Sequence, residues 1–184
     1  MENLGLGETI IPEGLVMVVL DTVQTFLKYS DWANQHVVRC SFPLSAEQLD
    51  RPFKMGMGSL RRTLLHIYHG EHVWLQRWKS ESVAWPPEDE SVSMITLAER
   101  FRKTWEERAA YLETLSDSEM DRFVVYVDSS GGYFRAKLGH MLIEGCLHST
   151  HHRAQAVNML RQLDAETPEL DYIMWIRRPT TRPT

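Results

Sequence analysis

Four long stretches of the chain repeat apolar residues every three to four positions, and no other sequence feature limits the fold as strongly. Each stretch is long enough for an amphipathic helix of several turns that buries one face. Proline and glycine separate the stretches, as at Pro43 and in the segment 55–58. The pattern predicts an all-α domain built as an antiparallel four-helix bundle. The four predicted helices cover residues 15–42, 60–78, 96–116 and 138–163.

Local signals indicate where several helices begin. The segment 45–48 has the Ser-x-x-Gln pattern of a capping box, which predicts a short helix after the first long one. Ser59 is placed to cap the second long helix. The segment 96–99 has the Thr-x-x-Glu pattern of another capping box, so we expect the third long helix to begin there.

Two segments depart from helical periodicity. Residues 123–127 and 133–137 are rich in β-branched and aromatic side chains, and a turn-forming segment with two glycines separates them. We therefore expect a short β-hairpin between the third and fourth long helices. After the fourth helix, residues 170–178 are expected to form a short docked helix or strand.

The length of 184 residues fits one domain. We expect this domain to cover residues 15–178, with tails over 1–14 and 179–184. A chain of this size buries a sufficient core without a disulfide or a metal. The only two cysteines, Cys40 and Cys146, suit a reducing compartment, which predicts a cytoplasmic protein.

Charge and hydropathy exclude several classes of partner. The chain has 20 Lys+Arg against 25 Asp+Glu, a net charge of −5, so nucleic acid is not an expected partner. The longest aliphatic run, over residues 15–20, is far shorter than the roughly 18 residues that a membrane span needs. The first 14 residues contain no Lys or Arg, whereas a secretory signal begins with positive charge. We expect a small-molecule substrate rather than nucleic acid or a membrane.

Eight histidines are the unusual part of the composition. His148 and His152 are four residues apart, so on a helix both imidazoles project from one face and can reach one divalent ion. The zincin motif uses this spacing but requires Glu where Ser149 stands. The ferritin-type Glu-x-x-His pairing is absent too, because Leu147 follows three residues after Glu144. The pair supplies two ligands, whereas a catalytic zinc-like site usually has three.

The second long helix offers three candidates for the third ligand, His66, His69 and His72. An ideal helix turns by about 100° per residue, so His66 and His72 point about 120° apart and cannot both face the bundle centre. His66 lies in the most apolar stretch, which suits a buried ligand. His69 is the reserve candidate, and His72 is expected to be partly exposed.

The histidines of the fourth helix also have an alternative explanation that involves no metal. A polar stripe on the fourth helix could instead form a hydrogen-bonded network inside the bundle. This stripe comprises His140, Glu144, His148 and His152. A ligand role is not expected for His36, His140 or His151.

Two segments carry a family resemblance. Residues 64–75, Leu-Leu-His-Ile-Tyr-His-Gly-Glu-His-Val-Trp-Leu, and residues 148–155, His-Ser-Thr-His-His-Arg-Ala-Gln, resemble the DinB/YfiT-like family of small bacterial proteins. The resemblance extends from Tyr29 on the first helix to Trp175 near the end, so it covers nearly the whole chain. Its most specific part is the His-x-x-x-His-Arg-x-Gln pattern, in which Ala154 stands where the family commonly has Gly.

The resemblance implies a four-helix bundle with up-down-down-up connections. It also implies a divalent metal, often nickel or zinc, whose ligands here would be His66, His148 and His152. Arg153 and Gln155 match the motif and are implied to position the helix or the surroundings of the ligands. A homodimer is implied as well, whereas no catalytic residue is identified.

The resemblance further implies an activity. Some relatives use the metal to activate a low-molecular-weight thiol such as bacillithiol or mycothiol in transferase or isomerase reactions. Our leading hypothesis is therefore a metal-dependent, thiol-transferase-like enzyme with a thiol cosubstrate. One alternative is a non-enzymatic, metal-stabilised stress-response binding protein. Another is a metal-dependent hydrolase, which lacks a convincing general base.

Overall fold

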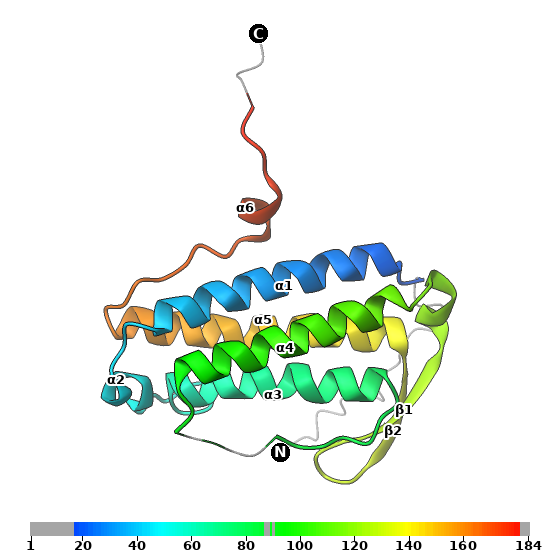
Figure 1. Cartoon of the computed structure of the whole chain (residues 1–184), viewed down its shortest axis with the longest axis horizontal. Coiled ribbons are helices and arrows are strands. Elements are labelled where there is room, and N and C mark those ends of the chain that lie inside the picture. Colours follow the sequence, from blue (N-terminus) through cyan, green and yellow to red (C-terminus); the bar gives the residue numbers. More distant parts are fainter. Residues whose placement is uncertain (1–16, 87–88, 90, 181–184) are drawn as a thin grey trace, which may run out of the picture.

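Four long helices form the body of the protein, as the periodicity predicted (Figure 1). The computed structural model describes residues 17–86, 89 and 91–180. The first and last helices of the bundle run in one direction and the middle two in the other, which confirms the up-down-down-up arrangement. The bundle helices are α1 (Leu20–Ser41), α3 (Leu60–Trp78), α4 (Met94–Glu113) and α5 (Leu138–Gln162).

The pairing of the helices follows from these directions. α3 and α5 run antiparallel and make the most extensive helix pair of the described chain. α1 packs against α5, and α4 contacts both α3 and α1, so the four helices close into a ring. α4 begins at the same end of the bundle as α3, so these two helices run parallel.

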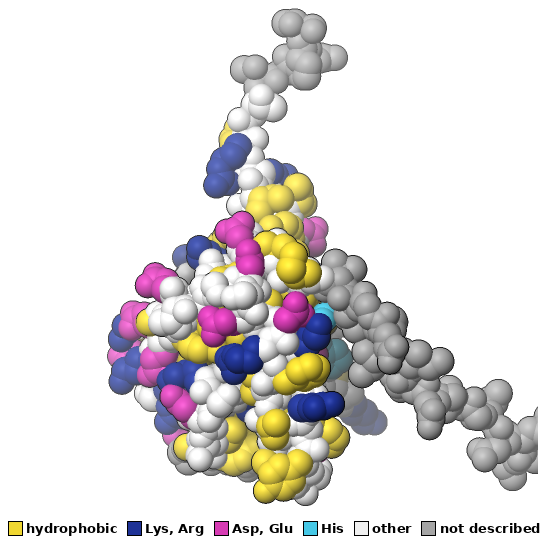
Figure 2. Space-filling model, turned by 90° about the vertical axis from the view of Figure 1, so that its right-hand side faces the viewer, with side chains coloured by type: hydrophobic (Ala, Val, Ile, Leu, Met, Phe, Trp, Pro, Cys, Tyr) yellow, Lys and Arg dark blue, Asp and Glu magenta, His cyan; other side chains and the backbone are white. Residues whose placement is uncertain are grey.

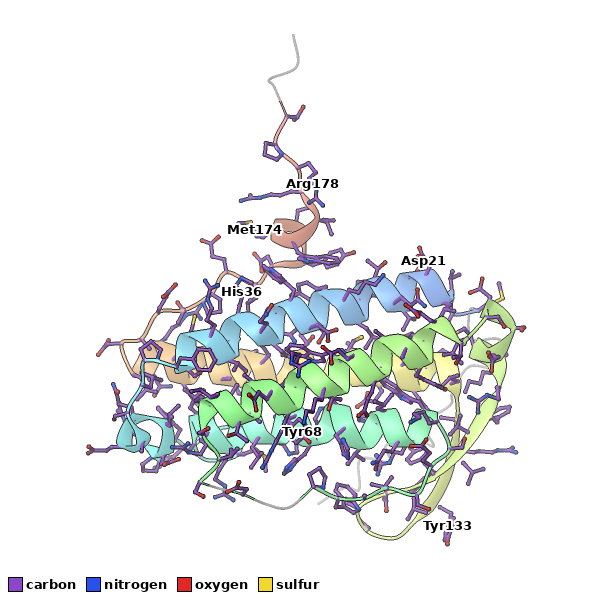
Figure 3. The ribbon with its side chains drawn as sticks, in the orientation of Figure 1. Asp21, His36, Tyr68, Tyr133, Met174 and Arg178 are labelled. Atoms are coloured by element: carbon purple, nitrogen blue, oxygen red, sulfur yellow. The ribbon has the colours of Figure 1, made fainter. Side chains whose placement is uncertain are left out.

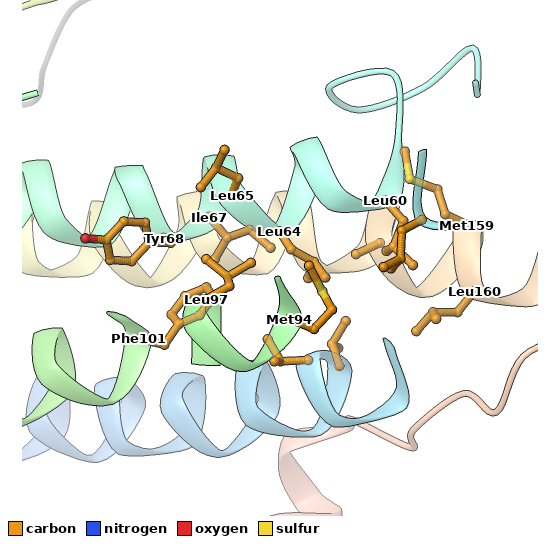
Figure 4. Packing of buried hydrophobic residues seen from close by; sticks show 14 of the residues in the cluster. Leu60, Leu64, Leu65, Ile67, Tyr68, Met94, Leu97, Phe101, Met159 and Leu160 are labelled. Atoms are coloured by element: carbon orange, nitrogen blue, oxygen red, sulfur yellow. The ribbon is translucent and has the colours of Figure 1, made fainter. Parts of the chain in front are cut away.

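Two apolar clusters fill the bundle. The larger one lies between α3, α4 and the end of α5, and Leu64, Leu97 and Phe101 are completely or almost completely buried in it (Figure 4). The second lies toward the hairpin and contains the buried Trp78 and Leu138. Burial of these side chains provides the main free energy of folding. The polar groups described below therefore lie within an apolar frame.

The observed starts of α2 and α3 agree with the predicted ones, whereas the start of α4 differs. Ser45 caps the short α2 (Ala46–Asp50) in a complete capping box, and Ser59 caps α3 by accepting from the Arg62 N–H. The predicted start at residue 96 was wrong, because Ser93 caps α4 and its hydroxyl accepts from the Thr96 N–H. The earlier start lets α4 bury Met94, which is 6% exposed.

The first helix is shorter than the periodicity suggested. α1 begins at Leu20, and residues 15 and 16 and the predicted tail over 1–14 lie outside the described residues. Val19 is extended, and the Leu20 N–H donates to the Asp117 carboxylate at 2.7 Å. A side chain from a distant segment therefore satisfies the helix terminus, which no local pattern could show.

The end of the bundle carries the predicted hairpin. A 3-10 helix, η1 (Asp117–Asp121), leads into β1 (Phe123–Val127), which pairs antiparallel with β2 (Tyr133–Lys137). Val124 is buried against the second apolar cluster, whereas Tyr133 is 80% exposed. Figure 2 views this end of the molecule and shows hydrophobic and basic side chains next to one another.

The C-terminal segment forms a short helix, α6 (Tyr172–Ile176), as one of the two expected alternatives. The Tyr29 hydroxyl donates to the Leu170 carbonyl, and Tyr172 packs on the rings of Phe26 and Tyr29. Beyond α6 the chain leads away from the bundle, where Figure 3 places Arg178. Among the helices described, none is both long and apolar enough to span a lipid bilayer.

Candidate metal centre

Three histidine side chains meet between α3 and α5. His66 comes from α3, and His148 and His152 come from successive turns of α5. Their ring centroids lie 4.4–5.1 Å apart. One nitrogen from each ring can be chosen so that all three atoms lie within 4.8 Å of one another. All three rings are partly exposed, so this cluster could hold one metal ion that solvent and ligands can reach.

A glycine makes room for the middle ring. Gly70 lies one turn after His66 on α3, directly against His148. A Cβ atom at position 70 would lie 2.4 Å from the Cε1 atom of His148 and 2.7 Å from its Nδ1 atom. Real Cβ atoms do not approach so closely, so glycine allows the imidazole to pack against the α3 backbone. Sequence reasoning assigned this residue no role.

A glutamine orients the third ring. The Nδ1 atom of His152 lies 2.9 Å from the Oε1 atom of Gln155, and the Nε2 atom of Gln155 lies 3.0 Å from the Nε2 atom of His151. An amide oxygen accepts, so Nδ1–H donates and the Nε2 atom of His152 keeps its lone pair. Partners of this kind set the tautomer and orientation of metal-binding histidines.

The surroundings keep these rings neutral. Burial, reinforced by the neighbouring imidazoles, lowers the pKa of His66 and of His148 to about 4. Burial also lowers the pKa of His152, and the hydrogen bond that His152 donates to Gln155 opposes this effect. Neutral imidazole is the form that binds metals, so the cluster is ready for an ion near neutral pH without losing protons.

The remaining histidines lie outside the cluster. His69 packs beside the Tyr68 ring, and His72 is partly exposed and lies 3.0 Å from the Gln76 amide. His36 lies on the outer side of α1, with its Nδ1 atom 2.8 Å from the Trp32 carbonyl oxygen (Figure 3). His140 is partly buried, and His151 is exposed.

The alternative interpretation of the α5 stripe as a hydrogen-bonded network does not match the structure. Glu144, the only acidic member of that stripe, is exposed. Within the described part of the chain, it makes no hydrogen bond to a histidine.

A second polar cluster, which sequence reasoning missed, surrounds the buried carboxylate of Glu71. Its Oε1 atom accepts from the Asn34 amide at 2.6 Å and the Ser149 hydroxyl at 3.3 Å. Its Oε2 atom accepts from the Trp105 indole at 2.7 Å and from Arg108 at 3.3 Å. Burial raises the pKa of Glu71 to about 7, while the hydrogen bond from Trp105 and the charge of Arg153 oppose this effect.

The motif arginine belongs to this second cluster. Arg153 is 2% exposed and donates to the Ser30 hydroxyl at 3.2 Å and to the Asn34 amide oxygen at 2.9 Å. Arg108 bridges the Glu71 and Asp31 carboxylates. Arg153 therefore connects α5 to α1 inside the bundle, whereas its neighbour His152 points to the histidine cluster.

Comparisons with known proteins agree with this architecture. The profile of the DinB family matches residues 17–181. Protein DinB from Bacillus subtilis (strain 168) is 20% identical over 165 residues, which cover 81% of this chain and 90% of that protein. A DinB-like protein from Bacillus cereus ATCC 10987 has the same fold, with a TM-score of 0.68 and 19% identity over 84% of this chain and 99% of the other. Since the family match spans almost every residue described above, this chain belongs to the DinB family.

Proposed function

We propose that this protein is a divalent-metal-dependent enzyme that activates a low-molecular-weight thiol for attack on an electrophilic small molecule. The observation that carries this proposal is the convergence of three neutral, partly exposed imidazoles with nitrogen atoms within 4.8 Å of one another. Three neutral ligands leave the charge of an ion uncompensated and its other positions open, which suits an anionic thiolate. Imidazole suits nickel and zinc, the two metals we propose.

The residues of the chain would prepare the site in separate ways. His66, His148 and His152 would hold the ion, Gln155 would orient His152, and Gly70 would leave space for His148. A bound divalent ion acts as a Lewis acid and lowers the pKa of a bound thiol. As the structure describes it, the cluster contains no carboxylate to act as a general base. A thiol that ionises on binding to a metal needs no such base, so the donor set is compatible with thiol chemistry.

The thiol would have to come from outside the chain. Burial raises the pKa of Cys146 to about 11, and burial also raises the pKa of Cys40. A thiol with a raised pKa is mostly protonated near neutral pH and is a poor nucleophile. A soluble thiol cosubstrate is therefore part of the proposal.

Elemental analysis of protein purified without an affinity tag tests the metal site. We expect about one nickel or zinc ion per chain, and loss of this ion in His148→Ala. His140→Ala is the matched control, because His140 lies on the same helix, two turns before His148 and outside the cluster. Equal metal content in both variants would contradict the assignment of the ligands.

A thiol-transfer assay then tests the chemistry. The metal-loaded protein is mixed with a panel of thiols and chlorodinitrobenzene, so that a carbon–sulfur bond forms, chloride leaves and the thiol proton passes to solvent. We expect a metal-dependent rate that disappears in His148→Ala and persists in His140→Ala. If metal binds but no thiol binds or reacts, while His148→Ala loses much of its melting temperature, the ion only stabilises the bundle.

A further inference from the structure

A separate cavity of about 370 Å³ lies at the end of α3, between the segment 80–85 and strand β1. Its volume falls within the range of roughly 300–1,000 Å³ that is typical of small-molecule sites. Arg77, Trp85 and Tyr126 line it, together with the valines Val83, Val125 and Val127. None of the three clustered histidines lines this cavity, so it is a second site on the molecule.

A buried cation forms part of the cavity wall. Arg77 is 8% exposed, and its Nη2 atom donates to the Val127 carbonyl oxygen at 2.8 Å. Its Nε atom is buried without a hydrogen-bond partner, counting the residues that the structure describes. A guanidinium carries five N–H donors, and leaving a buried donor unused costs free energy. One donor of an arginine that lines the cavity therefore lacks an acceptor.

Three aromatic rings hold this guanidinium in place. Its central carbon lies 4.8 Å from the ring centroid of Trp74, 5.1 Å from that of Tyr126 and 5.9 Å from that of Trp85. Cation–π contacts of this kind immobilise the charge without neutralising it. Within the described residues Arg77 forms no ion pair, and Asp128, which lines the same cavity, acts on it only through its charge.

The two acidic residues of the cavity are occupied elsewhere. The Oδ1 atom of Asp128 accepts from the backbone N–H groups of Ser130 and Gly132, at 2.8 and 2.9 Å. Glu81 pairs with Lys79 at 2.8 Å. Their presence still disfavours a multiply charged anion such as phosphate, because like charges at short range repel. A singly charged ligand with an apolar body fits the lining better.

We propose that this cavity binds a small organic carboxylate. The carboxylate accepts hydrogen bonds from Arg77, and the hydroxyls of Ser80 and Ser82, which also line the cavity, are available to the same group. The apolar or aromatic body of the ligand packs between Trp85 and the valine side chains. This proposal does not depend on a metal at the histidines.

Calorimetric titration of the full chain with benzoate, and with benzamide as its neutral analogue, tests the proposal. We expect saturable benzoate binding at millimolar concentrations and binding of benzamide at least about tenfold weaker, since benzamide lacks the charge. Benzoate binding should persist after treatment with EDTA. No benzoate binding, equal affinity for both compounds, or loss of binding after EDTA would each overturn the proposal.

Variants then locate the site. Arg77→Met should weaken benzoate binding at least about tenfold, and Arg161→Met, at an exposed position in the last turn of α5 and outside the cavity lining, should leave it unchanged. Because Arg77 also anchors β1, Trp85→Ala provides a second test at a side chain that is 57% exposed. We expect it to weaken binding several-fold. Parent-like affinity in either Arg77→Met or Trp85→Ala, or equal weakening in Arg161→Met, would overturn the proposal.

Discussion

The three histidines and the Glu71 carboxylate all lie between α3 and α5, but they differ in their hydrogen bonds and in their exposure. Glu71 accepts hydrogen bonds from residues of α1, α4 and α5 while it belongs to α3, so it connects all four bundle helices. The histidines come from two helices, are partly exposed, and turn nitrogen atoms toward one another. One cluster satisfies its polar groups internally, and the other leaves acceptors for a ligand.

This difference indicates that the Glu71 cluster holds the fold together, whereas the histidine cluster is arranged for binding and chemistry. A buried charge is tolerated when it is paired and hydrogen-bonded, as Glu71 is with Arg108. Converging lone pairs without donors contribute nothing to folding and are unfavourable unless something binds them. Consecutive residues of α5 serve the two clusters, since His148 and His152 face one and Ser149 and Arg153 face the other. The rotation of α5 about its own axis therefore positions the residues of both clusters.

The largest expected effect comes from breaking the internal cluster. Glu71→Leu leaves Arg153 and one side of Arg108 buried without a carboxylate, so we expect a loss of about 3–5 kcal/mol in the free energy of unfolding. Urea denaturation followed by circular dichroism measures it. Glu144→Leu, at an exposed position of α5, should change stability by no more than about 0.5 kcal/mol. Equal stability in the two variants would show that the Glu71 cluster does not hold the helices together.

The second largest effect is expected at the histidine cluster, where a double-mutant cycle can measure it. Gly70→Ala forces the His148 ring away, so we expect a cost of about 1–3 kcal/mol from overpacking and a metal affinity at least tenfold lower. In a His148→Ala background the clash is absent, and the higher helix propensity of Ala should make the same substitution neutral or stabilising by about 1 kcal/mol. Calorimetric titration with zinc and thermal denaturation measure the two quantities. Equal costs in both backgrounds would mean that Gly70 does not accommodate His148.

Sequence reasoning located the histidine cluster better than the Glu71 cluster for a physical reason. The spacing of His148 and His152 predicts a shared helix face, which is a local property of α5. Glu71 acts through Asn34, Trp105 and Ser149, which come from three other helices, so its role depends on packing. One signal was present, because Glu71 continues the apolar spacing of Leu64, Ile67, Leu75 and Trp78 along α3. A carboxylate at such a position must find buried donors.

The helix ends show the same limit. The capping box at Ser45 and the cap at Ser59 were predicted correctly, because each is formed within a few residues. The starts of α1 and α4 were misplaced. Asp117, almost a hundred residues away, caps α1, and burial of Met94 favours the earlier cap at Ser93. Long-range contacts of this kind leave no local periodicity for a sequence pattern to detect.

A smaller effect would sharpen the assignment of the ligands. Gln155→Leu removes the acceptor that orients His152, so we expect metal affinity to fall by about 10–100-fold while stability hardly changes. His151→Ala removes only the far end of the same chain of hydrogen bonds and should have a much weaker effect. Zinc titration against a competing chelator measures both affinities. If His151→Ala lowers affinity as much as Gln155→Leu, orientation of His152 by Gln155 is not the cause.

The smallest expected effect distinguishes the two clusters by the sign of their pH dependence in metal-free protein. The pKa of His66 and of His148 falls from 6.5 to about 4 on folding, so the unfolded chain binds more protons between these values. Their contribution to stability is complete above about pH 6.5 and is lost as the pH falls toward 4. Glu71 has the opposite sign, because its pKa rises from 4.5 to about 7, and its contribution is complete below about pH 4.5 and is lost as the pH rises through 7.

Single substitutions should separate these opposing slopes. Glu71→Gln removes the term that falls with pH, so its stability should rise more steeply than that of the parent between about pH 4.5 and 6.5. His148→Ala removes a rising term and should make the slope shallower. Each change amounts to at most about 1.4 kcal/mol per pH unit, the value for one proton. Urea denaturation across this range in the presence of a chelator measures the slopes. Slopes that change in the same direction in both variants would contradict the assignment of neutral histidines in one cluster and a buried carboxylate in the other. The two substitutions change the slope in opposite directions only if the pKa values of the histidines and of Glu71 shift in opposite directions on folding.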